Sequence, residues 1–501
     1  MSTLRLPLSG LLVLLLGSAA SPPAQGQVRV FFGNLHSHTS YSDGSATPEA
    51  GYRHARDVAR LDFLAITEHN HLGRMAQEPE LYAGPSSISL RSTAQRFSVD
   101  GQFLALFGQE FSSISSGNHA NVLEVGAVIS TAEVPNGRWD LLLQNWLPSH
   151  LDSQNQPAIL LLNHPSISSS PNDVEYGRDD FSTADAWRTA LNAHASLINM
   201  INGPSHNANG SPGRPSESEF RRYLNLGFHL APTADQDNHL ENWGSAADTR
   251  TGVIAQEFTR ASLLEALRER RVYATEDRNL RVIVRVAGHL MGSRVTGAAV
   301  PTSGTPLPIE VALSDDDEPF ASYRIEVFSD EIGGEEAEVV LTPTLTNGNS
   351  QVTIPGLSYG GAAQYVFLRI TQGHDDEDGR ERVWTAPVWF EPNATLPAPA
   401  GRSSVVLAVD RRAEEATITN TGDAPVDLRN WILVSTRGNQ RFQFTGSLVL
   451  APGASVVVTS GPNARQAPPQ FVRWTTTNVW NNDEDPAELY NADGHLVAEH
   501  R

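Results

Sequence analysis

Short apolar runs alternate with amphipathic segments from about residue 28 to residue 279. The amphipathic segments are typical of helices: Thr47, Pro48 and Glu49 form an N-cap followed by proline at the first helical position, and residues 263–271 close the series. Strand–helix alternation of this kind predicts a parallel sheet, either open or closed into a barrel. The predicted strands are residues 28–32, 61–67, 103–107, 158–162, 196–201 and 228–231.

The first strand leads into a pair of histidines. His36 and His38 are separated by one residue, and Asp43 and Gly44 follow. Neutral imidazole and carboxylate are ligands that Zn, Mn and Fe accept. In a chain with 16 histidines, one His-x-His pair is equally well explained by core packing, so its meaning depends on the rest of the chain.

The same residue types follow the other predicted strands. In α/β architectures the carboxyl ends of the strands carry the site. Any one of these residues alone is better explained as a core histidine or a helix-capping aspartate. Their recurrence at the same position in unit after unit predicts a polynuclear metal site. The residues are Glu68, His69, His71, Glu110, His119, His164, Asp237 and His239.

Together these motifs resemble the PHP (polymerase and histidinol phosphatase) family, and within it the CehA/McbA metallohydrolase branch. The resemblance covers roughly residues 30–280 and implies a distorted (β/α)7 barrel that holds two or three divalent ions, Zn, Mn or Fe. The motifs that carry it are His36-x-His38, Asp43, Thr67-Glu68-His69, Glu110, His119, Asn163-His164-Pro165 and Asp237-x-His239.

The resemblance also implies three groups of ligands. The first metal would be held by His36, His38, Glu110 and Asp237. The second would share Glu110 and be bound by His119 and His164, with His206 as the alternative to His119. The third would be held by Asp43, His69 and His239. Glu68 stands where the family usually has aspartate, and we expect it behind the ligands rather than among them.

A polynuclear metal centre of this kind indicates a hydrolase. Clustered cations lower the pKa of a bound water to about 7 and neutralise charge that builds up on a phosphate ester. Candidates for protonating the leaving group or binding the substrate anion are His71, His206 and Arg250. We therefore predict a phosphoesterase that acts on a small-molecule ester. Hydrolysis of other esters or carbamates is the alternative reaction, and a non-catalytic metal-dependent surface binding protein is the alternative from another class.

Composition and the N-terminus bear on location and partners. The net charge of −21 makes the electrostatic term with nucleic acid repulsive, so no general nucleic-acid binding is expected. Residues 1–26 have the layout of a secretory signal peptide, with Arg5 before an apolar segment over 11–16. No other apolar run reaches membrane length, and cysteine is absent. We expect an exported protein that is periplasmic, extracellular or at the cell surface.

Downstream of the metallohydrolase region, residues 27–280, the pattern changes to short alternating strands. Residues 281–391 predict a β-sandwich, 392–402 a Pro-rich linker, and 403–501 resemble a lamin-tail domain, an immunoglobulin-like sandwich with a role in surface association. We expect each sandwich to have its own core. The acidic runs 315–318 and 375–378 are better explained as solvated loops than as a calcium site.

Overall fold

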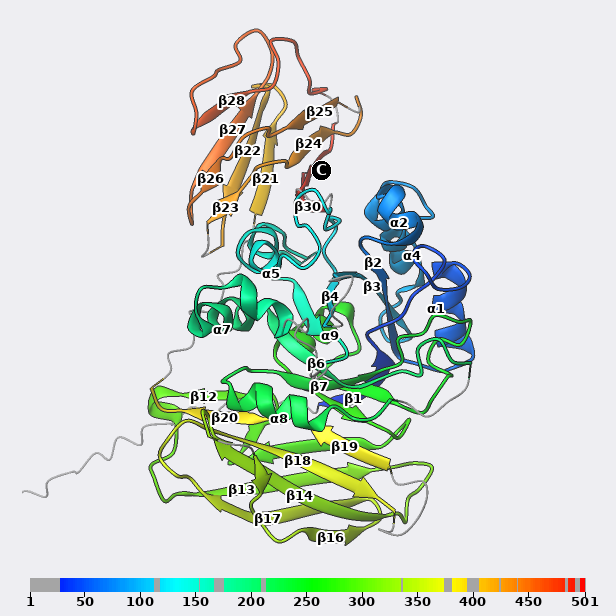
Figure 1. Cartoon of the computed structure of the whole chain (residues 1–501). Helices are drawn as coiled ribbons and strands as arrows, with labels where there is room; N and C mark the ends of the chain where they lie inside the picture. The colour runs from blue at the N-terminus through cyan, green and yellow to red at the C-terminus, as the bar shows by residue number, and fades with distance from the viewer. Residues whose placement is uncertain are drawn as a thin grey trace, which may run out of the picture.

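The computed structural model describes residues 28–500, except 112–117, 153, 166–174, 209–212, 335–336, 374–380, 394–404, 423–424, 439, 483–484 and 492–495. The predicted signal peptide lies outside these residues, and so does most of the predicted linker. Within the described part, no helix is both long enough and apolar enough to cross a membrane. The fold is mostly β, with helices concentrated in the N-terminal α/β region, residues 28–280 (Figure 1).

The α/β region alternates strands and helices, as the sequence predicts. Its strands are β1 (Arg29–Asn34), β2 (Phe63–His69), β3 (Leu104–Phe111), β4 (Ala120–Leu123), β5 (Ile159–Leu162), β6 (Ala195–Asn202), β7 (Ala231–Asp235), β8 (Arg250–Ala255) and β9 (Val272–Thr275). Its helices are α1 (Pro48–Asp57), α2 (Gly73–Gln77), α3 (Glu80–Ala83), α4 (Leu90–Phe97), α5 (Trp139–Leu141), η1 (Leu142–Trp146), α6 (Leu147–Ser149), η2 (Glu175–Asp180), α7 (Ala184–Asn192), α8 (Glu217–Asn225) and α9 (Arg260–Arg268). Helix α1 begins as predicted, because the Thr47 side chain accepts a hydrogen bond from Ala50 N.

The sheet of this region is mixed rather than purely parallel. β1, β2 and β3 run parallel, as do β5, β6 and β7. β4 lies antiparallel between β3 and β5. On the other side of the sheet, β8 pairs antiparallel with β1, and β9 pairs antiparallel with β8. A parallel pair needs a crossover of a dozen or more residues, and the connection from β3 to β4 is shorter. The described residues show no ladder from β7 back to β1, so a closed barrel is not confirmed.

Residues 281–391 form the first sandwich. One of its sheets has the order β11-β10-β13-β17, and the burial of β13 alternates along its length. The elements are β10 (Arg281–Val286), β11 (His289–Leu290), β12 (Arg294–Thr296), η3 (Gly297–Ala299), β13 (Pro306–Ser314), β14 (Ser322–Glu331), β15 (Glu338–Val339), β16 (Thr344–Asn347), β17 (Ser350–Ser358), β18 (Gln364–Gln372), β19 (Glu381–Thr385) and β20 (Val388–Glu391).

The first sandwich is continuous with the α/β region. β19 pairs antiparallel with β9, so that Trp384 lies opposite Ala274, and the combined sheet has 16 strands. One hydrophobic cluster contains Phe31 and Leu264 together with Leu368. The expectation of a separate core was therefore wrong for residues 281–391. Pairing with β19 covers an edge of β9 that would otherwise leave backbone groups unpaired.

Residues 405–500, the tail, form a second sandwich, at the top of Figure 1. Its two main sheets have the orders β21-β22-β27-β28 and β25-β24-β29-β30, and a separate cluster that includes Trp431 and Trp480 lies between them. For the tail, the expectation of its own core is confirmed. The strands are β21 (Val405–Asp410), β22 (Glu415–Asn420), β23 (Val426–Asp427), β24 (Ile432–Ser435), β25 (Gln440–Gln443), β26 (Val449–Leu450), β27 (Ser455–Thr459), β28 (Phe471–Arg473), β29 (Ala487–Tyr490) and β30 (Leu496–His500).

Candidate metal centre

The predicted ligands converge at one rim of the α/β sheet. Parallel strands end at the same rim. The antiparallel strand β4 begins at this rim, so His119, which directly precedes β4, lies beside the ends of the neighbouring strands β3 and β5. The register pairs His69 of β2 with Glu110 of β3. An isolated parallel bridge between Ser37 and Asn238 joins the segments that follow β1 and β7. These pairings bring residues from 36 to 239 together.

Three donor atoms of the first group are spaced like ligands of one metal. Asp237 Oδ1 lies 3.2 Å from His36 Nε2 and 3.2 Å from His38 Nε2, and these two nitrogens are 3.2 Å apart. Glu110 Oε1 lies 3.4 Å from His36 Nε2, and the other oxygen, Oε2, lies 3.4 Å from His38 Nε2. Donors about 2.1 Å from one ion lie about 3.4 Å apart in tetrahedral geometry. The spacing of His36, His38 and Asp237 therefore suits three ligands of one metal, with Glu110 beside them.

Glu110 is the central residue of the centre. Its Oε1 lies 3.1 Å from His119 Nδ1 and 3.3 Å from His164 Nε2. Its Oε2 lies 3.0 Å from His69 Nδ1. The side chain is 1% exposed, and both of its oxygens face imidazoles. Such a carboxylate can bridge two cations.

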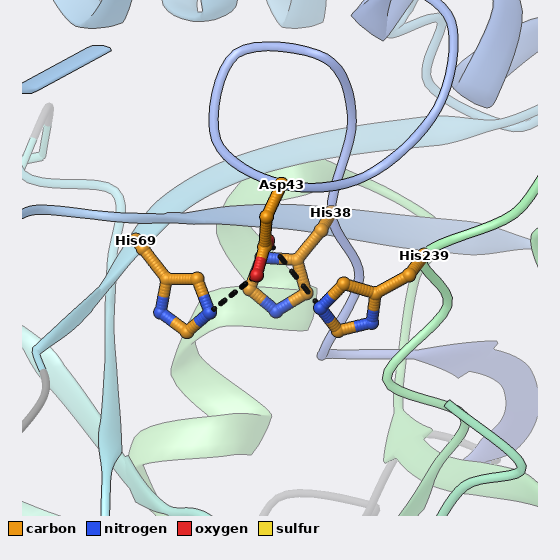
Figure 2. A group of neighbouring side chains, drawn as sticks. All are labelled: His38, Asp43, His69 and His239. Atoms are coloured by element: carbon orange, nitrogen blue, oxygen red, sulfur yellow. Dashed lines mark ion pairs between the residues drawn. The ribbon is translucent and has the colours of Figure 1, made fainter. Parts of the chain in front are cut away.

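The third group surrounds Asp43 (Figure 2). Asp43 Oδ2 lies 3.5 Å from His69 Nε2, and Oδ1 lies 3.4 Å from His239 Nε2. His38 also faces this group, since its Nδ1 is 3.8 Å from Asp43 Oδ1. The loop that carries Asp43 folds tightly, because a Cβ on Gly44 would lie 2.6 Å from the carbonyl carbon of His38. His38 and His69 each face two of the three groups.

The charges keep the carboxylates ionised. Burial alone would lower the pKa of His36, but Asp237 and Glu110 raise it to about 9. Burial would also lower the pKa of His69, but Glu110 and Asp43 raise it to about 11. At His38 burial prevails and lowers the pKa to about 4. Although burial opposes it, the histidines hold the pKa values of Glu110 and Asp237 below their usual range. Deprotonated carboxylates are the form that binds metal.

The residues weighed as alternatives or helpers take different positions. The His206 ring packs against His239 at a tilt of 33°, with ring centroids 3.8 Å apart, while His119 contacts Glu110. The His71 ring lies 5.6 Å from that of His69, at the edge of the centre. Arg250 is 5% exposed and donates to the carbonyl oxygens of Ala247 and Thr249. The position of Arg250 does not support the predicted role in binding a substrate anion.

Glu68 lies behind the ligands, as expected. Its carboxylate accepts hydrogen bonds from Thr39 N at 3.1 Å and from the hydroxyls of Thr39 and Ser42. Burial raises the pKa of Glu68 to about 7, although these hydrogen bonds oppose the shift. The residue therefore holds the loop that positions Asp43.

Other polar residues support the ligands and were not predicted as site residues. Asn163 Nδ2 donates to Glu110 Oε1 at 2.8 Å. Asn202 Nδ2 and Ser205 Oγ donate to Asp237 Oδ2 at 3.0 and 3.1 Å. Asn202 ends β6, so the rule that strand ends carry the site could have found it. Amides are not among the imidazole and carboxylate ligands that the sequence pattern indicates.

The donor chemistry fits divalent transition metals. Imidazole nitrogen and carboxylate oxygen form a mixed set of the kind that Zn, Mn and Fe share. Asp237 Oδ1 is a buried atom without a hydrogen-bond partner among the described residues, yet it faces two imidazole nitrogens. His/Asp/Glu clusters compatible with metal binding are thus present.

Comparison with known families adds one assignment. Residues 397–501 match the model of the family described as Lamin Tail Domain. The C-terminal region is a lamin-tail domain. The match agrees with the separate β-sandwich core of the tail, and it covers none of the residues of the metal centre.

Two curated relatives are similar to a larger part of the chain. An uncharacterized protein of Chlamydia muridarum is 24% identical over 394 residues, which are 73% of this chain and 58% of the relative. A second, from Chlamydia trachomatis serovar D, is 24% identical over 400 residues, 74% of this chain and 59% of the relative. The chain thus spans about three fifths of the length of the curated relatives it matches.

A solved structure shows a weak similarity. It is a two-domain protein from Bacteroides vulgatus that contains a predicted PHP-like metal-dependent phosphoesterase. The identity is 16%, the match covers 73% of this chain and 99% of the other, and the TM-score is 0.36. A TM-score of this size does not establish a common fold, so the function rests on the residues of the centre.

Proposed function

We propose that this protein is a divalent-metal-dependent hydrolase, and specifically a phosphoesterase acting on a small-molecule ester. The observation that carries the proposal is the position of Glu110, whose two buried oxygens face imidazoles of different groups. The proposed ligands are those predicted from the sequence: His36, His38, Asp43, His69, Glu110, His119, His164, Asp237 and His239.

Bound divalent ions supply Lewis-acid chemistry and favour deprotonation of water near neutral pH. The chain itself fixes the donors. Asn163 orients Glu110, and Asn202 with Ser205 orients Asp237, so that one oxygen of Asp237 stays free to face His36 and His38. Burial lowers the pKa of His71, so this imidazole is neutral at pH 7 and suits proton acceptance. His206 is exposed beside His239, so it is better placed than His71 to protonate a leaving group.

The finer structural and cellular assignments also belong to the proposal. The α/β region would be a PHP-type barrel over residues 27–280, followed by a sandwich over 281–391, a linker over 392–402 and the lamin-tail domain over 403–501. Residues 1–26 would direct export. The lamin-tail domain would then place the enzyme at the cell surface.

The test combines metal analysis with a substrate panel. Purified protein should contain two or three equivalents of Zn, Mn or Fe, and chelation should abolish hydrolysis of phosphate esters. Glu110→Gln should lose both properties, whereas Glu49→Gln, a control at an exposed carboxylate on α1, should keep them. Turnover of carboxylic esters or carbamates alone would replace the phosphoesterase assignment. Bound metal without turnover on any ester would favour a binding protein.

A further inference from the structure

A second group of carboxylates lies away from the metal centre, where the α/β region meets the first sandwich. Asp277 lies between β9 and β10, and Asp315 and Glu318 lie between β13 and β14. One ligand oxygen from each can be chosen so that all three lie within 4.8 Å of one another. Asp315 is 0% exposed and Asp277 4%. Glu381 of β19 shares a hydrogen bond with Asp277.

Backbone N–H groups donate to two members of this group: Asn279 N and Leu280 N to Asp277, and Asp317 N and Glu318 N to Asp315. Nevertheless, within the described ranges, no arginine or histidine forms an ion pair with any of these four carboxylates, and the nearby Arg281 pairs with Asp316 instead. Burial and the charge of Asp277 raise the pKa of Glu381 to about 8. Carboxylates that lie close together disfavour each other's ionised form. A bound cation would therefore favour ionisation of the whole group.

Two buried side chains on the neighbouring strands point to a ligand at this place. Tyr323 of β14 and Gln372 of β18 lie opposite each other in the sheet and are 1% and 5% exposed. Tyr323 Oη and Gln372 Oε1 have no hydrogen-bond partner among the described residues. The Gln372 amide nitrogen donates to Asp315 Oδ2 at 3.0 Å, which places the end of this side chain at the carboxylate group. Tyr323 is its cross-strand neighbour, and burial together with the charges of Asp315 and Asp277 raises the pKa of the Tyr323 hydroxyl.

We propose that Asp277, Asp315 and Glu318 bind a calcium ion that links the α/β region to the first sandwich. All three donors are carboxylate oxygens, and calcium binds 6–8 oxygens, water included, at about 2.3–2.6 Å in flexible geometry. Ligands of one ion at these lengths lie within about 5 Å of one another, as the oxygens of these three carboxylates do. Magnesium demands stricter octahedral geometry and shorter bonds. Residues 315–318 are thus more than a solvated loop.

Terbium luminescence of the full chain tests the proposal, because Tyr323 would transfer excitation to a lanthanide bound in the calcium position. We expect saturable emission that calcium displaces, with a calcium dissociation constant between about 10⁻⁵ and 10⁻³ M. Calcium at a hundredfold excess over that constant should raise the melting temperature of the α/β region and first sandwich by about 4 °C. Glu110→Gln should keep both responses, which separates this site from the proposed catalytic centre.

The variants make the test specific. Glu318→Gln, at an exposed position that should not affect folding, and Asp277→Asn should each weaken calcium binding about tenfold or more. Tyr323→Phe should lose most of the emission while the calcium-dependent melting shift persists. Asp316→Asn, an exposed carboxylate of the same loop, should bind like the parent. Unchanged binding in Glu318→Gln and Asp277→Asn, an equal loss in Asp316→Asn, or no calcium response in the parent would each overturn the proposal.

Discussion

The two sandwiches have similar sequence patterns, but they are attached to the rest of the chain in different ways. The first shares a sheet and a hydrophobic cluster with the α/β region, through β9 and β19. The lamin-tail domain has separate sheets and a separate cluster. Alternating strands predict a sandwich in both cases. They do not show whether an edge strand of the sandwich pairs with another part of the molecule.

Polar contacts reinforce the first junction. Arg382 of β19 pairs with Glu276 at 2.7 Å, and Arg369 of β18 pairs with Glu217 of α8 at 2.9 Å. The α/β region and first sandwich therefore form one body, residues 28–391. The lamin-tail domain faces this body with residues between 425 and 431, which line one pocket with residues between 133 and 155. The Asn491 amide also donates to Asn155 Oδ1 at 3.4 Å. We therefore expect the α/β region and the first sandwich to unfold as one cooperative unit and the lamin-tail domain to unfold separately. Four experiments test this difference.

The largest effect should come from truncation. A chain that ends at residue 280 loses the partner of β9 and part of the shared core, so we expect no folded, soluble protein. A chain that lacks 403–501 should fold and hydrolyse small substrates at nearly the parent rate. Circular dichroism, gel filtration and turnover measure these outcomes. A folded 27–280 fragment would show that the junction is dispensable, and a folded but inactive chain without the tail would show that the tail closes over the site.

Glu110→Gln should reduce turnover more than about 10³-fold, because a bridging carboxylate supports two cations and metal catalysis contributes several kcal/mol. Metal loss should also lower the melting temperature of the body, including the first sandwich, since they share one core. The transition of the lamin-tail domain should not move. Calorimetry with metal analysis separates the two transitions. A first sandwich that melts independently of metal content would contradict the single body.

Matched tryptophan substitutions compare the cores. Trp384 is 0% exposed, and its Nε1 donates to Glu217 at 2.7 Å; Trp480 is 3% exposed in the tail cluster. Replacement of either by alanine should cost about 3–5 kcal/mol. Trp384→Ala should destabilise the whole body, whereas Trp480→Ala should move only the transition of the lamin-tail domain. Denaturant unfolding followed by near-ultraviolet dichroism gives both values, and a shift of both transitions in either variant would argue against two units.

The smallest effect concerns Glu391, which contacts His229 of the α/β region at 2.9 Å across the junction and Arg294 of its own sandwich at 2.8 Å. Burial would raise the pKa of Glu391, but these partners lower it below its ordinary value of 4.5. A carboxyl of this kind contributes stability above the unfolded pKa that is lost as the pH falls through the folded pKa. The advantage of the parent over Glu391→Gln, about 1 kcal/mol, should thus disappear on acidification below about pH 4.5. Urea unfolding across that range measures it, and an advantage that grew on acidification would reverse the sign.

The sequence alone determined the strand–helix alternation, the start of α1 at Thr47 and the residues that gather at the rim. It could do so because periodicity and capping are local, and because parallel strands deliver their ends to one edge. The match of residues 397–501 to a lamin-tail model likewise confirms a resemblance that was visible in the motifs.

Only the tertiary structure decided the pairing of β9 with β19, the antiparallel strands β4, β8 and β9, and the amides that orient Glu110 and Asp237. It also buried Arg250 and brought Asp277 beside Asp315 and Glu318. These are contacts between residues far apart in the chain. Their free energy depends on burial and on which partner meets a strand edge or a charge, and neither is encoded in a local pattern.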